Sequence, residues 1–239
     1  MIISYRYNYI FVKTKKTAGT TVELNLAPSC GPDDVITELG VQEELLRGNG
    51  VPLCRNFATP EVEESVRQGI LARKGTKQKS LDLGPRRERN TFWNHMHAAD
   101  IKSRVPEDVW NKAFKFTIER HPYEKAVSMA YFKFKPNNTK EPFEKHLDDT
   151  VRLGRYAGFP FYTIHGKVAV DEIIRTESLL ADLKRLGEKL GFPVPDKLLS
   201  AKTRSRADRR PAREILSEEQ RKVVQKFCKK EFELLGWEP

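Results

Sequence analysis

The sequence predicts an α/β fold with a central parallel sheet flanked by helices, because a strand, a turn and a helix follow one another three times. The first such unit spans residues 5–26, the second 113–134 and the third 168–190. Strands that alternate with helices are typical of parallel sheets, in which each helix returns the chain to the next strand. A chain of 239 residues suits one domain of this size. We therefore expect a single domain over residues 1–239.

The predicted strands have the composition of buried sheet residues. The first is rich in aromatic and β-branched residues around Ile10, and the third is an apolar run over residues 168–174. The second, over residues 113–118, alternates phenylalanine and isoleucine with lysine and threonine, which is a period of two. These three stretches are the predicted core of the sheet.

The predicted helices begin and end at residues that favour helix termini. Pro122 opens the helix of the second unit, since proline is favoured at the first helical position. The helix over residues 178–190 carries its leucines on one face. A last helix begins at Ser217, where Gln220 completes a capping box, and it stops at Gly236.

Residues 28–90 have the least regular pattern in the chain. We expect them to form an insertion on the substrate side of the fold, with short helices over residues 34–46 and 60–73 joined by loops. The following stretch, residues 74–89, is basic and polar. It is interpreted either as a flap over an acidic substrate or as a solvated loop.

The loop after the first strand has the chemistry of an anion site. Residues 13–21 hold three lysines, four threonines and one glycine. A glycine lets the backbone approach a ligand, a helix N-terminus offers N–H donors, and a lysine adds positive charge. We predict a phosphate-binding loop made of Lys16, Thr17, Ala18, Gly19, Thr20 and Thr21. It is not a Walker A loop, because its only glycine follows the lysine instead of preceding it.

A second anion site is predicted where the second strand ends. Arg120 follows that strand directly, and Ser128 lies in the helix that Pro122 opens. Both side chains could reach an anion at the N-terminus of this helix, the arginine through its bidentate fork.

Together the two motifs resemble those of carbohydrate-type sulfotransferases, which use 3'-phosphoadenosine 5'-phosphosulfate (PAPS). K-T-A-G-T-T resembles the 5'-phosphosulfate loop of this family, and F-K-F-T-I-E-R-H-P-Y-E-K-A-V-S resembles its 3'-phosphate motif. The resemblance implies a P-loop-NTPase-like sulfotransferase fold and PAPS as cosubstrate without a metal. It also implies that Arg120 and Ser128 hold the 3'-phosphate. The sequence departs from the family pattern at His121 and Lys125, where asparagine and arginine are common.

The family resemblance also indicates a general base. A hydroxyl acceptor must lose a proton near neutral pH, and imidazole is the side chain suited to that. His95 occupies the histidine of the family stretch His-x-x-Ala-x-x-Ile, whereas His97 falls where relatives vary. We predict His95 as the base and Lys16 as the residue that stabilises the leaving phosphate. A structural role for both histidines is the alternative.

A basic loop precedes the last helices, over residues 202–210. The resemblance places the variable cofactor-clasping loop of the family here. It implies that Lys202, Arg204 and Arg206 close over the 3'-phosphate and the adenosine. A solvated surface loop is the alternative.

The composition predicts the kind of partner and the cellular compartment of the protein. A formal net charge of +10 indicates anionic partners. Cys30, Cys54 and Cys228 lack metal-ligand spacing, which favours a reducing compartment and no zinc site. Without a long apolar run, we expect a cytoplasmic protein that has no membrane span. The oligomeric state and the acceptor stay open, with a carbohydrate or another small hydroxylated molecule expected for the latter.

Two other functions are compatible with the sequence. A nucleotide kinase or NTPase with a divergent P-loop would use residues 168–171 as a Walker B strand that ends in Asp171. A nucleic-acid-binding module would use the arginine-rich loop as its electrostatic footprint.

Overall fold

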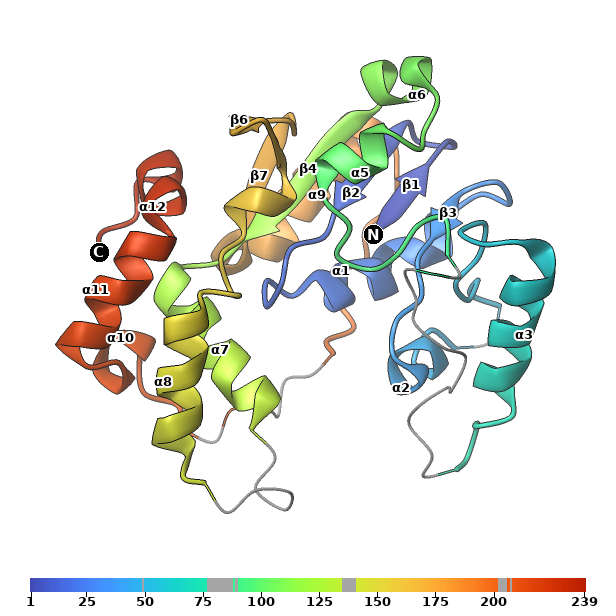
Figure 1. The fold of residues 1–239 in the computed structure, drawn as a ribbon. Helices are drawn as coiled ribbons and strands as arrows, with labels where there is room; N and C mark the ends of the chain where they lie inside the picture. The colour runs from blue at the N-terminus through green and yellow to red at the C-terminus, as the bar shows by residue number, and fades with distance from the viewer. Residues whose placement is uncertain (49, 77–87, 89, 135–140, 202–205, 207) are drawn as a thin grey trace.

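A five-stranded sheet forms the centre of the fold (Figure 1). The computed structural model describes residues 1–48, 50–76, 88, 90–134, 141–201, 206 and 208–239. Along the sheet the strand order is β3-β1-β2-β4-β7. The bounds are Ile2–Ser4 for β1, Tyr9–Val12 for β2, Val35–Ile36 for β3, Phe114–Glu119 for β4 and Glu172–Arg175 for β7.

The sheet is mixed, which corrects the prediction of a parallel sheet. Strands β2, β4 and β7 are parallel, but β1 pairs antiparallel with both β2 and β3. The side chain of Asp34 holds the tight turn between β1 and β2, because its Oδ1 accepts hydrogen bonds from the N–H groups of Tyr5 at 2.7 Å and Arg6 at 3.1 Å. A connection this short allows only an antiparallel pair.

Alternate residues of β2 face two different cores. Tyr9 and Phe11 pack with α1 (Gly19–Leu26) and α9 (Leu179–Leu190). Ile10 and Val12 pack on the opposite face, in a cluster that includes residues of α3, α5 and α6. Those helices span Pro60–Leu71, Ala98–Lys102 and Glu107–Lys112. The period of two predicted for the strands thus separates two buried layers.

A group of helices with its own core lies beside the sheet, at the left of Figure 1. It contains α7 (Pro122–Lys133), α8 (Phe143–Leu153), α10 (Ala212–Ile215), α11 (Glu218–Phe227) and α12 (Lys229–Leu235). The predicted capping box of Ser217 and Gln220 is present at the start of α11. The single last helix that we predicted is broken at Cys228, and the buried residues Glu231 and Phe232 follow the break.

Two other sequence predictions need correction. Residues 34–46 are not one helix, because Val35 and Ile36 pair with β1 and only Val41–Leu45 (α2) is helical. In the stretch expected as the third strand, Lys167–Val168 (β6) pairs with Thr163–Ile164 (β5) in a separate hairpin. Only Glu172–Arg175 joins the main sheet. The helix predicted over residues 60–73 is confirmed as α3.

None of the helices in the described part of the chain combines the length and the apolar character needed to cross a membrane.

Candidate functional site

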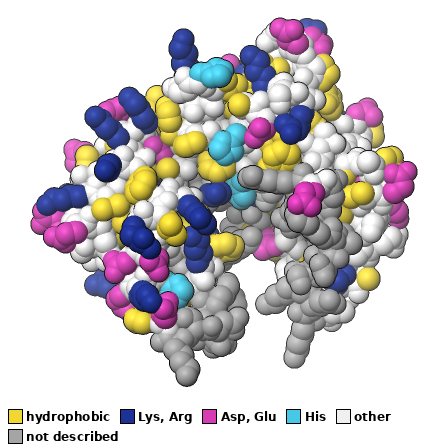
Figure 2. Space-filling model, in the orientation of Figure 1, with side chains coloured by type: hydrophobic (Ala, Val, Ile, Leu, Met, Phe, Trp, Pro, Cys, Tyr) yellow, Lys and Arg dark blue, Asp and Glu magenta, His cyan; other side chains and the backbone are white. Residues whose placement is uncertain are grey.

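A cavity of about 1030 Å³ lies where the parallel strands end. Its lining includes residues 13–21 after β2, Arg120 after β4, and Leu179 at the start of α9, which follows β7. Ligand sites of open α/β sheets lie at this carboxyl edge. Figure 2 shows a hollow on this face of the molecule, with side chains of Lys and Arg in dark blue on one side of it.

The predicted phosphate loop forms part of the cavity wall, since all six of its residues line the cavity. Lys16 and Ala18 both have left-handed backbone angles, with φ of 61° and 59°. Ala18 is the N-cap of α1 and provides no side-chain cap for it. The start of α1 therefore offers backbone N–H donors without a competing acidic group in its first turn.

Lys13 is buried beneath this loop. Its ammonium donates a hydrogen bond to Thr20 Oγ1 at 3.2 Å and forms an ion pair with buried Glu23. Burial alone would raise the pKa of Glu23, but the neighbouring positive charges, Lys13 foremost, lower that pKa to about 2. The sequence pattern did not predict this pair, because a lysine that follows a strand has the pattern of a solvated residue.

The structure gives Gly19 a packing role beneath the loop. A Cβ atom at this position would lie 2.6 Å from Lys13 Cγ and 2.8 Å from its Cε. The glycine therefore leaves room for the buried stem of Lys13. Its predicted role, to let the backbone approach a ligand, stays a prediction.

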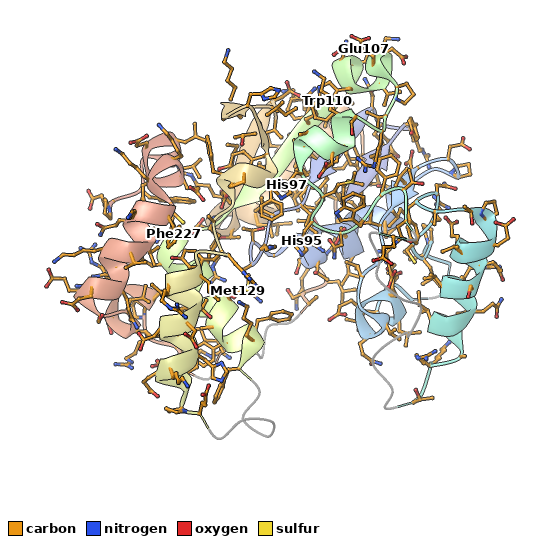
Figure 3. All side chains as sticks on the ribbon, viewed as in Figure 1. His95, His97, Glu107, Trp110, Met129 and Phe227 are labelled. Atoms are coloured by element: carbon orange, nitrogen blue, oxygen red, sulfur yellow. The ribbon has the colours of Figure 1, made fainter. Side chains whose placement is uncertain are left out.

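His95 lines the cavity, whereas His97 does not belong to its lining. Figure 3 shows both histidines in the middle of the molecule, on the segment that precedes α5. Nδ1 of His95 lies 3.3 Å from the carbonyl oxygen of Lys13. The ring of His97 packs on Phe161, with 4.5 Å between ring centroids.

The environment of His95 keeps its ring neutral. Burial, followed by the positive charge of Lys13, lowers the pKa of His95 to about 3. If Nδ1–H donates to the Lys13 carbonyl, Nε2 carries the lone pair. A pKa of about 3 is far below the near-neutral value on which His95 was predicted as the base, so Nε2 is a weaker proton acceptor at neutral pH than expected.

Two arginines of the predicted 3'-phosphate site meet at one carboxylate. Oε2 of Glu124 lies 3.0 Å from Nη2 of Arg120 and 2.6 Å from Nη1 of Arg206. Both arginines and Ser128 line the cavity. The predicted ligands Lys202 and Arg204 lie outside the described residues. No sequence motif pointed to Glu124, because its arginine partner at position 206 is far away in the chain.

The two departures from the family pattern have structural contacts away from the cavity. Lys125 is buried, and its Nζ lies 2.6 Å from Glu119 Oε2 and 3.7 Å from Glu231 Oε1. Nδ1 of His121 accepts a hydrogen bond from the N–H of Tyr123 at 3.3 Å, and its ring packs against Trp237. Neither residue is part of the cavity lining.

No site role was predicted for the rest of the lining, although Lys15 lies in the anion loop of residues 13–21 and Arg209 in the basic loop of residues 202–210. This part of the lining adds further positive charge through Lys15, Lys133, Arg155 and Arg209, and apolar surface through Met129, Phe132, Leu179 and Leu198. No group of three His, Cys, Asp or Glu residues that could hold a metal occurs within the described ranges.

Asp171 lies at the far end of the sheet from the phosphate loop. Its Oδ2 accepts a hydrogen bond from the N–H of Lys115, near the start of β4, at 2.7 Å. A Walker B aspartate would instead follow the carboxyl end of its strand, so this placement does not support the kinase interpretation.

Comparisons of the chain with protein-family models, with curated proteins and with solved structures found no match.

Proposed function

We propose that this protein is a sulfotransferase that moves the sulfuryl group of PAPS to the hydroxyl group of an acceptor, a carbohydrate or another small hydroxylated molecule. The observation that carries this proposal is that one cavity is lined by an anion loop, a pair of arginines and a neutral histidine. The loop follows β2 and Arg120 follows β4, so two neighbouring parallel strands supply the two anion sites.

The cavity offers a matching surface to each part of the donor. The N–H groups at the start of α1, together with Lys16, suit the 5'-phosphosulfate. Arg120, Arg206 and Ser128 suit the 3'-phosphate, since guanidinium groups bind phosphate in a bidentate way. The apolar side chains of Met129, Phe132, Leu179 and Leu198 provide a surface for the purine.

The chemistry assigned to these residues is an in-line displacement at sulfur. A bond forms between the acceptor oxygen and sulfur while the bond from sulfur to the 5'-phosphate oxygen breaks. His95 takes the hydroxyl proton at Nε2. Lys16 and the N–H groups of the loop meet the negative charge that grows on the departing phosphate oxygen.

A ligand-binding experiment separates this proposal from its alternatives. 3'-Phosphoadenosine 5'-phosphate (PAP) should raise the melting temperature in the absence of magnesium, with a stabilisation of about 2.7 kcal/mol at a hundredfold excess over its Kd. No shift with millimolar PAP beside a clear shift with magnesium and ATP would favour a kinase. Salt-dependent binding of DNA or RNA without a PAP response would favour a nucleic-acid-binding module.

A further inference from the structure

We propose that the acceptor carries a negatively charged group beside the hydroxyl that receives the sulfuryl group, and that Arg155 binds this group. The inference rests on the proposed function. Among the described residues, the cavity lining contains eight Lys and Arg side chains and no Asp or Glu. A cleft lined by charge of one sign concentrates ligands of the opposite sign.

Half of these cations already have a role. Glu23 neutralises Lys13, and Lys16 is assigned to the 5'-phosphosulfate. Arg120 and Arg206 share Glu124 and are assigned to the 3'-phosphate.

The other four come from different segments of the chain. Arg209 belongs to the segment of Arg206, and Lys133 belongs to α7 along with Ser128, so both are close in sequence to the 3'-phosphate site. Lys15 belongs to the anion loop of residues 13–21, next to Lys16, and Arg155 comes from another segment. Of the four, Arg155 is therefore the one whose chain segment contributes to neither proposed donor site.

Arg155 belongs to a connection that also reaches the proposed base. This connection joins α8 to the short helix Phe159–Phe161 (η3). The ring of Phe161 lies 6.4 Å from the ring of His95, and Lys15 Nζ lies 5.1 Å from the centre of the Phe161 ring. Within the described ranges, no carboxylate forms an ion pair with Arg155. Arg155, a cation without an acidic partner among the described residues, therefore lies in the connection that leads to η3, and Phe161 of η3 contacts the base.

Packing on one side and hydrogen bonds to buried Glu231 on the other hold the backbone around Arg155, whose side chain is exposed. Gly154 ends α8 in a left-handed conformation with φ of 62°, and a Cβ there would lie 2.6 Å from the ring of Phe227. On the other side, Oε1 of Glu231 accepts hydrogen bonds from the N–H groups of Gly158 at 2.8 Å and Phe159 at 3.2 Å. A guanidinium on a fixed backbone loses less freedom when it binds a carboxylate or sulfate.

The test compares two acceptor probes that differ by one carboxylate. p-Nitrophenyl β-D-glucuronide and p-nitrophenyl β-D-glucoside are titrated into PAP-saturated protein by calorimetry. The glucuronide should bind at least about tenfold more tightly, the scale of a hydrogen bond to a charged group. Arg155→Gln should abolish this difference. Arg152→Gln removes the same charge from an exposed residue of α8 that does not line the cavity, and it should preserve the difference.

The outcomes separate the acceptor proposal from the donor proposal. If PAP does not bind, the proposed function itself fails. If PAP binds but the glucuronide does not bind, or binds no better than the glucoside, only the acceptor inference is overturned. If Arg155→Gln and Arg152→Gln reduced the preference for the glucuronide equally, the inference would also be overturned. Equal reductions would indicate non-specific electrostatic attraction and not a binding site at Arg155. Transfer of sulfate from PAPS to the glucuronide, faster than to the glucoside, gives a second supporting readout.

Discussion

Glu124 and Arg206 are 82 residues apart in the sequence and form an ion pair with 2.6 Å between Oε2 and Nη1. The same carboxylate also binds Arg120, and its Oε1 accepts a hydrogen bond from the N–H of Ala212 at 2.9 Å. Glu124 therefore holds two guanidinium groups side by side at one end of the cavity. Because each guanidinium has five N–H donors, both retain donors for a phosphate after they bind Glu124.

Arg206→Gln should weaken the binding of PAP by roughly 1.5–3 kcal/mol, the scale of hydrogen bonds to charged groups. Binding of adenosine 5'-phosphate, which lacks the 3'-phosphate, should hardly change. Arg210→Gln is a matched control, because Arg210 is an exposed residue of the same loop that pairs with Asp208 and does not line the cavity. Calorimetry with both nucleotides measures the effect. Equal weakening of the two nucleotides by Arg206→Gln would remove Arg206 from the 3'-phosphate site.

Gly19→Ala should destabilise the protein by about 1–3 kcal/mol, the usual cost of overpacking a buried site. The added Cβ would lie 2.6 Å from Cγ of Lys13. That side chain cannot move aside easily, since it is buried and paired with Glu23. Urea unfolding of the variant and the parent measures the difference. Parent-like stability would mean that the Lys13 side chain can adopt another conformation that accommodates the added Cβ.

The sequence was most informative where a motif is continuous. The predicted phosphate loop and the turn at Arg120 each lie in one short run of residues, so their patterns predict both the local structure and its place at the end of a strand. Strand β1, Ile2–Ser4, is too short to show a period of two. Its pairing with β2 depends on a turn that is held by the side chain of Asp34, a residue distant in the sequence. For this reason the antiparallel half of the sheet was not predicted.

Contacts between distant segments could not be predicted for a related reason. The pairing of Glu124 with Arg206 exists only after α7 and the segment before α10 have packed together. Arg155 has no motif around it, and only the fold brings it to the same cavity as His95. Charged residues in such stretches have the same local pattern as solvated ones.

Lys16→Ala should lower kcat by more than it lowers the affinity for PAP. In the proposed mechanism the Lys16 ammonium acts on charge that grows only in the transition state, and such interactions affect turnover rather than ground-state binding. Steady-state kinetics with PAPS and calorimetry with PAP give the two values. A loss of PAP affinity as large as the loss of turnover would assign Lys16 to donor binding alone.

The low pKa of His95 predicts a loss of stability in acid. Burial lowers this pKa to about 3 in the native protein, whereas the ordinary value is 6.5. Between these values the unfolded chain binds a proton that the native state does not, so the free energy of unfolding should fall as pH falls from 6.5 towards 3. The slope is at most about 1.4 kcal/mol per pH unit. His95→Asn has no such group and should lose less stability between about pH 7 and about pH 5, as urea unfolding would measure.

The same substitution tests the base, with His95→Asn expected to lower kcat by about 10²–10⁴ without changing the affinity for PAP. Asparagine is chosen because His95 has a left-handed backbone, with φ of 60°, that asparagine tolerates, and because its amide can still donate to the Lys13 carbonyl. The asparagine side chain cannot take the proton of the acceptor hydroxyl, so the substitution should lower kcat. His97→Asn is the control, since His97 packs on Phe161 and is not part of the cavity lining. Both variants must first melt like the parent at neutral pH. Near-full turnover of His95→Asn on an acceptor that the parent sulfates would place the base elsewhere in the cavity.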